Sequence, residues 1–267
     1  MSIEDEQIKI FVINLESQKT RKEFIEEQLN KRNLEYEVIN AVDGKKLSED
    51  HILQYYSKEF YENKHFSYTL GLVGCTLSHF FIYERIVREK IPYSMIMEDD
   101  IILTADFNKS FLEALYPVLQ VDVLLMLFYQ KYSPFKLNIN KKISINSEYA
   151  LYKQTDLHTL VSTGCYVISY EIAKKMYGDL LPLTTAPDEW STFKERNYFK
   201  DISVVYPFII NPAFFETSIS NIEFNNRILN SLLVLIKKHN FLFFNNVVKL
   251  RRKYLFNKTR IIQKISE

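Results

Sequence analysis

Three consecutive carboxylates, Glu98, Asp99 and Asp100, directly follow the apolar run Ser94–Met97. This run has the length and composition of a buried strand, and strands of open α/β sheets bind ligands at their carboxyl ends. Because side chains alternate along a strand, Glu98 and Asp100 are expected on one side and Asp99 on the other. Crowded carboxylates beside a dry strand repel unless they take up protons or a cation neutralises them. Such hard oxygen ligands suit Mg²⁺ or Mn²⁺, which usually also bind substrate phosphates.

A plain acidic turn after a core strand is the alternative interpretation. Turns usually contain Gly, Asn or Pro, whereas the apolar residues Ile101, Ile102 and Leu103 follow the triplet at once. A cation site at a strand end is therefore favoured, and phosphoryl, nucleotidyl and glycosyl transfer all fit a cation that holds a diphosphate. The chain contains neither G-x-x-x-x-G-K-[ST] nor G-x-G-x-x-G, so a kinase or another P-loop enzyme is disfavoured.

The elements that must position the triplet alternate as in an α/β protein. Strand, helix and strand within about 35 residues at the start of the chain form a βαβ unit, which implies parallel strands. The polar stretch 131–147 is predicted to be a loop. Strands are predicted at 9–15, 36–42, 94–98, 121–129, 161–169 and 202–206, and helices at 20–31, 47–61, 72–89, 107–119 and 170–181, with Ser17 and Ser48 as caps.

Small side chains form a stripe on the predicted helix 72–89. Gly71, Gly74, Cys75 and Ser78 recur at i, i+3, i+4 and i+7, so they share one face of the helix. Such a stripe lets another backbone or a ligand come close. His79 lies beside it, and a lone helical His is more often satisfied by its neighbours than catalytic.

Composition indicates a globular protein with a substantial core. The chain has 267 residues, 47% of them apolar, which allows one large domain or one domain with an appendage. The N-terminus resembles no signal peptide, and no stretch is expected to reach the roughly 18 apolar residues of a membrane span. Cys75 and Cys165 have no ligand-like spacing, so free thiols in a reducing compartment are the simplest expectation.

Charge is unevenly distributed along the chain. Residues 223–267 contain 10 Lys and Arg but 2 Asp and Glu, a balance of +8, whereas the remainder has a balance of −7. We therefore divide the chain into a domain at 1–222 and a basic tail at 223–267, which is predicted to form two helices, the second one imperfectly amphipathic. Basic amphipathic helices commonly lie on anionic membranes, but a solvated helix packed on the body fits equally well.

Five short motifs follow one another along the chain. They are Val12–Leu15 with Arg21, Ala41–Gly44, Gly74–His79, Met97–Asp100 and the later run Thr163–Ser169. Taken in order, they resemble glycosyltransferase family 25, the lipooligosaccharide galactosyl- and glucosyltransferases of Gram-negative bacteria, which are related to the collagen galactosyltransferases. The resemblance implies a GT-A fold, that is, a Rossmann-like mixed sheet flanked by helices, together with a UDP-sugar donor, a metal on the acidic triplet and transfer with inversion.

The resemblance also gives roles to particular residues. Glu98 and Asp100 would hold Mn²⁺ or Mg²⁺ on the diphosphate, where the metal stabilises the charge of the leaving group. Arg21 would reach a phosphate or the ribose, although an exposed charge on the first helix is an equally good interpretation. Asp43 would meet the nucleoside, with a plain turn Asp as the alternative. The other implied donor-site residues are Asn14, Ala41, Gly74, Ser78, His79 and Asp99.

Inversion requires a general base that takes the proton of the attacking acceptor hydroxyl. Asp188 is the predicted base, because the family usually has an Asp after a proline-bearing loop here; Glu189 is the second candidate, and an N-cap role is the alternative for Asp188. Trp190 would either stack on a sugar or anchor the core. Two stretches depart from the family pattern: the segment 182–186 fits it only loosely, and Thr163–Gly164 reverses the family's usual Gly-Thr. His158 is a candidate third metal ligand.

Together these features predict a cytoplasmic, inverting, metal-dependent transferase that moves galactose or glucose from a UDP-sugar to lipooligosaccharide or a similar glycolipid. The basic tail would hold it at the inner membrane, and no nucleic acid is expected as a partner. A sugar nucleotidyltransferase is the alternative enzyme, but the Gly-rich, basic nucleotide loop typical of that class is not found. The alternative without catalysis is a membrane-associated binding protein whose acidic triplet is structural.

Overall fold

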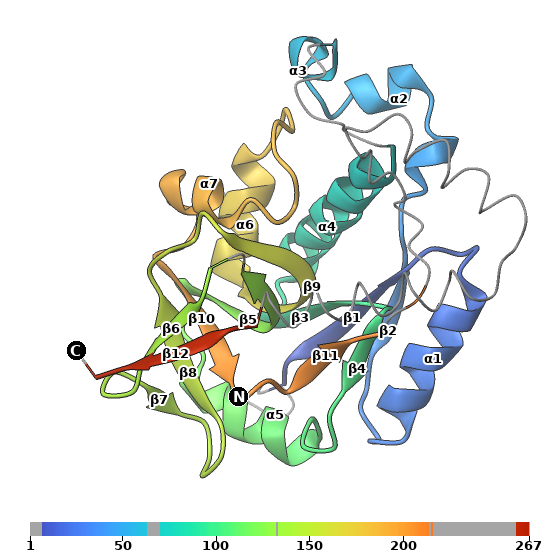
Figure 1. Ribbon diagram of the computed structural model, residues 1–267. Helices are drawn as coiled ribbons and strands as arrows, with labels where there is room; N and C mark the ends of the chain where they lie inside the picture. The colour runs from blue at the N-terminus through green and yellow to red at the C-terminus, as the bar shows by residue number, and fades with distance from the viewer. Residues whose placement is uncertain (1–6, 63–69, 132, 214, 216–259, 267) are drawn as a thin grey trace, which may run out of the picture.

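A large mixed sheet organises the fold, in the strand order β2-β1-β3-β9-β5-β10-β8-β7 (Figure 1). The computed structural model describes residues 7–62, 70–131, 133–213, 215 and 260–266. The strands of this sheet are β1 (Lys9–Asn14), β2 (Glu37–Asn40), β3 (Tyr93–Glu98), β5 (Val123–Lys131), β7 (Ile143–Ser144), β8 (Ala150–Gln154), β9 (Leu160–Ser169) and β10 (Asp201–Tyr206). Two small sheets pair β4 (Ile101–Leu103) with β11 (Ile210–Pro212), and β6 (Phe135–Asn138) with β12 (Ile262–Ile265).

Both parallel and antiparallel neighbours occur in the sheet. β1 runs parallel to β2 and to β3, so the carboxyl ends of these three strands meet at one edge. β9 runs antiparallel to β3 and β5, while β10 runs parallel to β5 and antiparallel to β8. The predicted βαβ unit at the start of the chain is confirmed, as is the α/β class with a mixed sheet flanked by helices.

Helices cover both faces of the sheet, and this explains why its central strands are apolar throughout (Figure 1). Along β1, Phe11 and Ile13 pack on the face of α4, α6 and α7, whereas Ile10 and Val12 pack on the face of α1 and α5. The helices are α1 (Lys19–Asn30), α2 (Glu49–Leu53), α3 (Lys58–Glu62), α4 (Leu70–Glu89), α5 (Lys109–Leu115), α6 (Tyr170–Asp179) and α7 (Trp190–Glu195), with 3₁₀ helices η2 (Gly44–Lys46) and η3 (Tyr116–Val118).

Helix α4 carries the predicted stripe of small residues, and its glycines bring another backbone close. A Cβ on Gly74 would lie 2.3 Å from the carbonyl oxygen of Val42, and a Cβ on Gly44 would lie 1.7 Å from that of Leu70. By length and composition α4 would also suit a membrane span, but here it is a core helix, with Val73, Leu77 and Phe80 buried. The stripe thus accommodates the segment that joins β2 to η2.

Gly74→Ala should lower the free energy of unfolding by about 1–3 kcal/mol, because backbone rather than a flexible side chain meets the added methyl group. Gly178→Ala in α6 is the matched control, since a Cβ there meets nothing within 4 Å. It should leave stability unchanged or raise it by up to about 1 kcal/mol. Urea unfolding of both variants measures the difference; equal stabilities would contradict the close approach of α4 to η2.

Several predicted boundaries are wrong, and the reasons are local. The predicted loop 131–147 contains the edge strands β6 and β7, and the predicted helix 47–61 is divided into α2 and α3. Ser48 does cap α2 through the amide of His51, but α1 begins after Gln18 rather than after a Ser17 cap. Both strands are short: β6 spans only Phe135–Asn138, and β7 only the exposed pair Ile143–Ser144, so neither gives a long enough pattern within a polar stretch.

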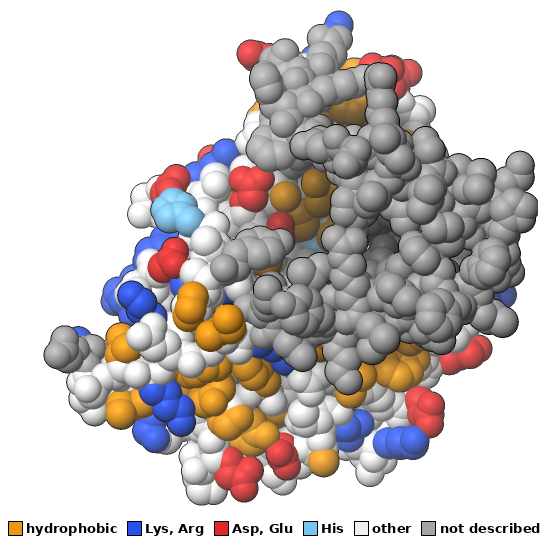
Figure 2. All heavy atoms as spheres, in the orientation of Figure 1, with side chains coloured by type: hydrophobic (Ala, Val, Ile, Leu, Met, Phe, Trp, Pro, Cys, Tyr) orange, Lys and Arg blue, Asp and Glu red, His pale blue; other side chains and the backbone are white. Residues whose placement is uncertain are grey.

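The end of the predicted helical tail is a strand. β12 pairs in parallel with β6, with Ile262 opposite Phe135. The Arg260 guanidinium lies 4.0 Å from the ring centroid of Phe208 and donates to the carbonyl of Ile210 at 2.7 Å. Hydrophobic side chains gather on the surface around β6 and β12 (Figure 2). The predicted helix is therefore wrong at Ile262–Ile265, because β6 offers a strand edge; residues 216–259 of the tail lie outside the described part of the chain.

Candidate active site

A cleft of about 340 Å³ lies at the edge where the carboxyl ends of β1 and β3 meet. Its walls come from the loop after β1, the start of α1, the 41–45 segment, α4 and the acidic triplet. Asn14, Gly74 and Asp188 do not line it. The predicted site residues that do line it are Arg21, Ala41, Asp43, Ser78, His79, Glu98, Asp99 and Asp100.

Arg21 binds two members of the triplet. Its Nη2 lies 2.7 Å from Asp99 Oδ1 and also pairs with Asp100 Oδ2. Asn14 does not line the cleft, but its Nδ2 donates to the second oxygen of Asp99 at 2.6 Å and thereby holds this carboxylate in place. The expected alternation is wrong here, because β3 ends at Glu98 and the two aspartates leave the strand to meet one guanidinium. Arg21 is buried, so the interpretation as an exposed charge is also wrong.

Burial is the main cause that raises the pKa of all three carboxyl groups. It raises the pKa of Glu98 to about 7, with a further contribution from the charge of Asp100. The guanidinium of Arg21 acts in the opposite direction on Asp99 and Asp100, but both pKa values stay raised. Three carboxyl groups thus share one guanidinium as their cation. The carboxylate oxygens of Glu98 and Asp100 are the hard ligands that Mg²⁺ and Mn²⁺ prefer.

Arg21→Gln should cost about 3 kcal/mol of stability at pH 7, because it leaves the buried Asp99 without its cation. Lys22→Gln removes the neighbouring, exposed ion pair to Glu26, at 3.9 Å, and should cost less than about 0.5 kcal/mol. Chemical unfolding monitored by circular dichroism compares the two. If both variants are equally stable, the Arg21–Asp99 pair does not hold the cleft together.

A pH dependence follows from Glu98. The folded protein keeps a proton on this group up to about pH 7, whereas a Glu with the ordinary pKa of 4.5 loses its proton earlier. Stability of the metal-free protein should therefore fall as pH rises between about 4.5 and 7. Glu98→Gln stays neutral, so at pH 8 it should be more stable than the wild type by at most about 3 kcal/mol, with no difference near pH 4. Urea unfolding across this range with a chelator tests it; parallel curves would contradict the raised pKa.

Helix α4 presents Ser78 and His79 on the same wall. Ser78 Oγ accepts from the amide of Val42 at 2.8 Å and donates to the carbonyl of Gly74 at 2.7 Å, so it ties the 41–45 segment to the helix. Asp43 caps η2 through the amide of Lys45 while also lining the cleft. Burial lowers the pKa of His79 to about 3, so its imidazole is neutral.

Strand β9 holds two carboxylates through adjacent residues. The backbone amide of Ser162, at φ 96°, donates to Asp188 Oδ2 at 3.1 Å, and Thr163 Oγ1 donates to Glu98 Oε1 at 2.5 Å. Both Glu98 and Asp188 act electrostatically on the thiol of Cys75 and raise its pKa, after burial. Asp188 therefore lies near the cleft wall although it does not line the cleft.

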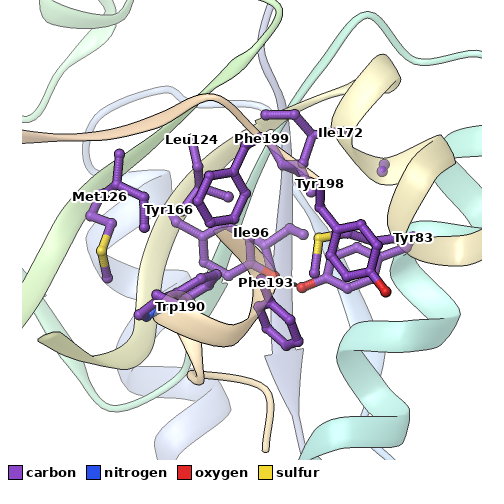
Figure 3. Close-up of a cluster of buried hydrophobic side chains, with 14 of the residues drawn as sticks. Tyr83, Ile96, Leu124, Met126, Tyr166, Ile172, Trp190, Phe193, Tyr198 and Phe199 are labelled. Carbon is purple, nitrogen blue, oxygen red and sulfur yellow. Dashed lines mark hydrogen bonds between the residues drawn. The ribbon is translucent and has the colours of Figure 1, made fainter. Parts of the chain in front are cut away.

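Asp188, Glu189 and Trp190 have different surroundings in the structure. The N-cap of α7 is Glu189, so the N-cap role for Asp188 is wrong. The carboxylate of Glu189 accepts from the amide of Ala186 at 3.2 Å and from Thr192 Oγ1 at 3.4 Å, so local structure uses it. Trp190 is fully buried and packs edge-to-face with Tyr166 (Figure 3), which supports the interpretation as a core anchor.

The sequence motifs do not single out Cys75 and Thr163 as site residues. In the sequence Cys75 is only a small residue on the stripe of α4, but in the structure it lines the cleft. Thr163 belongs to the reversed motif Thr163–Gly164, and its hydroxyl binds Glu98. A Cβ on Gly164 would lie 2.4 Å from the Phe128 ring. His158 is exposed and does not line the cleft.

Comparisons with known proteins agree with the motifs. "Procollagen galactosyltransferase 2" of Homo sapiens is 26% identical over 190 residues, 66% of this chain and 29% of that protein. "Lipooligosaccharide biosynthesis protein lic2B" of Haemophilus influenzae is 28% identical over 185 residues, 66% of this chain and 64% of that protein. A "Glycosyltransferase 25 family member" of Drosophila melanogaster is 37% identical over 97 residues, 35% of this chain and 16% of that protein.

The chain thus spans less than a third of the length of these two animal relatives. The model of the family described as "Glycosyltransferase family 25 (LPS biosynthesis protein)" matches residues 7–190, which include β1, the cleft, the acidic triplet and Asp188. Because this match covers most of the 267 residues, the chain belongs to glycosyltransferase family 25.

Proposed function

We propose that this protein is an inverting glycosyltransferase that moves galactose or glucose from a UDP-sugar to lipooligosaccharide or a similar glycolipid. The observation that carries the proposal is the cleft in which Arg21 meets Asp99 and Asp100 beside Glu98, at the carboxyl ends of parallel strands. The names of two relatives add support, because one denotes lipooligosaccharide biosynthesis and the other galactosyl transfer.

The donor would lie along the cleft with its diphosphate at the triplet. Glu98 and Asp100 would hold Mn²⁺ or Mg²⁺, and the ion would supply positive charge to the departing diphosphate. The fit rests on the three carboxylates, all with raised pKa values, that face a single guanidinium. Arg21 orients Asp100 by its ion pair, and Asn14 fixes Asp99 from behind.

The nucleoside would lie against the segment that follows β2. Ala41, Val42 and Asp43 line the cleft there, and Ser78 and the glycines of α4 fix their backbone. The carboxylate of Asp43 can accept from a ribose hydroxyl, while its cap to Lys45 keeps it in place. Gly74 therefore contributes packing rather than a donor contact.

The acceptor would approach from the side of Asp188. In an inverting displacement the acceptor oxygen attacks the anomeric carbon as the bond to the diphosphate breaks, and a base takes the hydroxyl proton. Ser162 holds Oδ2 of Asp188, which leaves Oδ1 to take that proton. Asp188 also raises the pKa of the Cys75 thiol, after burial and Glu98, which is consistent with a position of this carboxylate beside the cleft.

Contact with an anionic membrane through the basic tail is also part of the proposal, together with a cytoplasmic location at the inner membrane. Its support is the charge balance of +8 over residues 223–267. Most of that tail lies outside the described residues, so this part stays a prediction from sequence.

Calorimetric titration of the full chain with UDP-galactose, UDP-glucose and UDP tests the donor directly. Binding of at least one of them is expected in the presence of Mn²⁺, with clear weakening by a chelator and no comparable binding of a GDP-sugar. Turnover of UTP with a hexose 1-phosphate, instead of UDP-sugar binding, would identify a nucleotidyltransferase. If no nucleotide binds under any condition, the transferase proposal is wrong, and the acidic triplet has a structural role.

A further inference from the structure

Three side chains of metal-binding type meet on the wall of the cleft formed by α4 and the end of β3. One ligand atom from each of Cys75, His79 and Glu98 lies within 4.8 Å of the other two. Cys75 and His79 are four residues apart on α4, so both project from the same face of the helix. All three residues also line the cleft, so the cluster lies at its wall.

The imidazole of His79 is held as a metal ligand would be. Its Nδ1 lies 2.8 Å from the hydroxyl of Tyr166, which in turn lies 2.8 Å from the hydroxyl of Tyr83. When Nδ1 donates to the phenol oxygen, Nε2 carries the free lone pair, and such outer partners orient most metal-binding histidines. His79 is only 1% exposed, and its buried Nε2 has no hydrogen-bond partner among the described residues.

The chemistry of the three donors differs from that of the acidic triplet. Thiolate, imidazole and carboxylate together suit zinc, whereas Mg²⁺ and Mn²⁺ prefer oxygen donors alone. Three protein ligands are also the number found at zinc sites whose fourth position is open to water or a substrate. Thr163 already fixes one oxygen of Glu98, which limits the movement of this carboxylate.

We propose that Cys75, His79 and Glu98 bind a zinc-like divalent ion, with an open fourth position that faces the cleft. The site shares Glu98 with the proposed diphosphate site but does not depend on the transferase proposal, because its ligands are complete without a nucleotide. Occupation by zinc would engage the carboxylate of Glu98. Zinc is therefore expected to inhibit any transfer that uses Glu98 and Asp100 for Mn²⁺.

Cobalt is the probe of choice, because a thiolate bound to Co²⁺ gives an intense near-ultraviolet band and four-coordinate Co²⁺ gives visible bands. The full chain is stripped of metal and titrated with Co²⁺ in the absence of nucleotide. One equivalent should produce both sets of bands, and Zn²⁺ should abolish them by displacement. A wild-type spectrum without a thiolate band would overturn the proposal.

Variants assign the ligands. Cys75→Ser should lose the thiolate band, whereas Cys165→Ala removes the other free cysteine and should retain it. His79→Gln should weaken Co²⁺ binding by at least about 10-fold. Tyr166→Phe removes the hydroxyl that contacts both His79 and Tyr83 and leaves the three ligands in place, so it should weaken binding by about 10- to 100-fold. A band that survives in Cys75→Ser or disappears in Cys165→Ala would place the metal elsewhere.

Two further measurements keep the result unambiguous. Circular dichroism and thermal unfolding establish that each variant is folded, and Tyr166→Phe still tests the site if Cys75→Ser does not fold. Asp100→Asn should keep the cobalt spectrum, because Asp100 is not a ligand of this cluster. A slower hexose transfer in that variant with an unchanged cobalt spectrum would show that the two metal sites are distinct, so that each proposal can fail without the other.

Discussion

Asp100→Asn should lower the rate of hexose transfer by about 10²–10³-fold, because it removes an oxygen donor from the place where charge develops on the leaving diphosphate. The side chain lies in the cleft and pairs with Arg21, so an amide of the same size keeps the shape while losing the charge. The loss is expected mainly in kcat at saturating Mn²⁺, as for an interaction that strengthens in the transition state.

A matched control for this prediction lies at the surface. Asp122 forms an exposed ion pair with Lys200 at 3.8 Å and does not line the cleft. Asp122→Asn carries the same chemical change and should leave kcat within about twofold, since exposed pairs contribute little. Transfer by Asp100→Asn at the wild-type rate, with full dependence on Mn²⁺, would show that another group holds the metal.

Asp188→Asn should lower kcat by about 10²–10⁴-fold, because the acceptor hydroxyl then loses its proton acceptor. The amide oxygen can still accept from the backbone of Ser162 at the position of Oδ2, so donor binding and stability should change little. Initial rates at saturating UDP-sugar and acceptor measure the loss, and hydrolysis of the donor without acceptor is followed separately.

Glu189→Gln is the variant that distinguishes Asp188 from Glu189 as the general base. Its carboxylate accepts from Ala186 and Thr192, so its replacement should alter local stability more than the rate of transfer. A large loss of kcat in Glu189→Gln, with near-normal rates in Asp188→Asn, would transfer the role of base to Glu189. Equal, small effects in both would place the base outside this loop.

The part of the fold that could be predicted is the part with strong apolar patterns. β1, β3 and β9 each have a neighbouring strand on both sides, and their runs of apolar residues stand out because helices cover both faces of the sheet. β7 could not be recognised, since Ile143 and Ser144 lie exposed at the sheet edge. β12 was assigned to a helix, because its pairing with β6 depends on a contact between residues more than a hundred positions apart.

The candidate site, like the fold, could be predicted from the sequence only in part. The acidic triplet and the small residues of α4 could be found from the sequence pattern, and all of them except Gly74 line the cleft. The ion pairs of Arg21 with Asp99 and Asp100 could not be found, because they depend on where β3 ends. Asn14, Ser78 and Gly74 were grouped with the donor-binding residues, but their visible contacts are with Asp99, Val42 and the backbone of the 42–44 segment.

The central claim is that the cleft transfers a hexose from a UDP-sugar, and release of UDP measures it most directly. The full chain is incubated with UDP-galactose or UDP-glucose and Mn²⁺, with and without a lipooligosaccharide acceptor and a chelator. We expect acceptor-dependent UDP release with one of the two donors, lost on chelation and reduced in Asp100→Asn. No release of UDP from either donor under any of these conditions would contradict the proposed function.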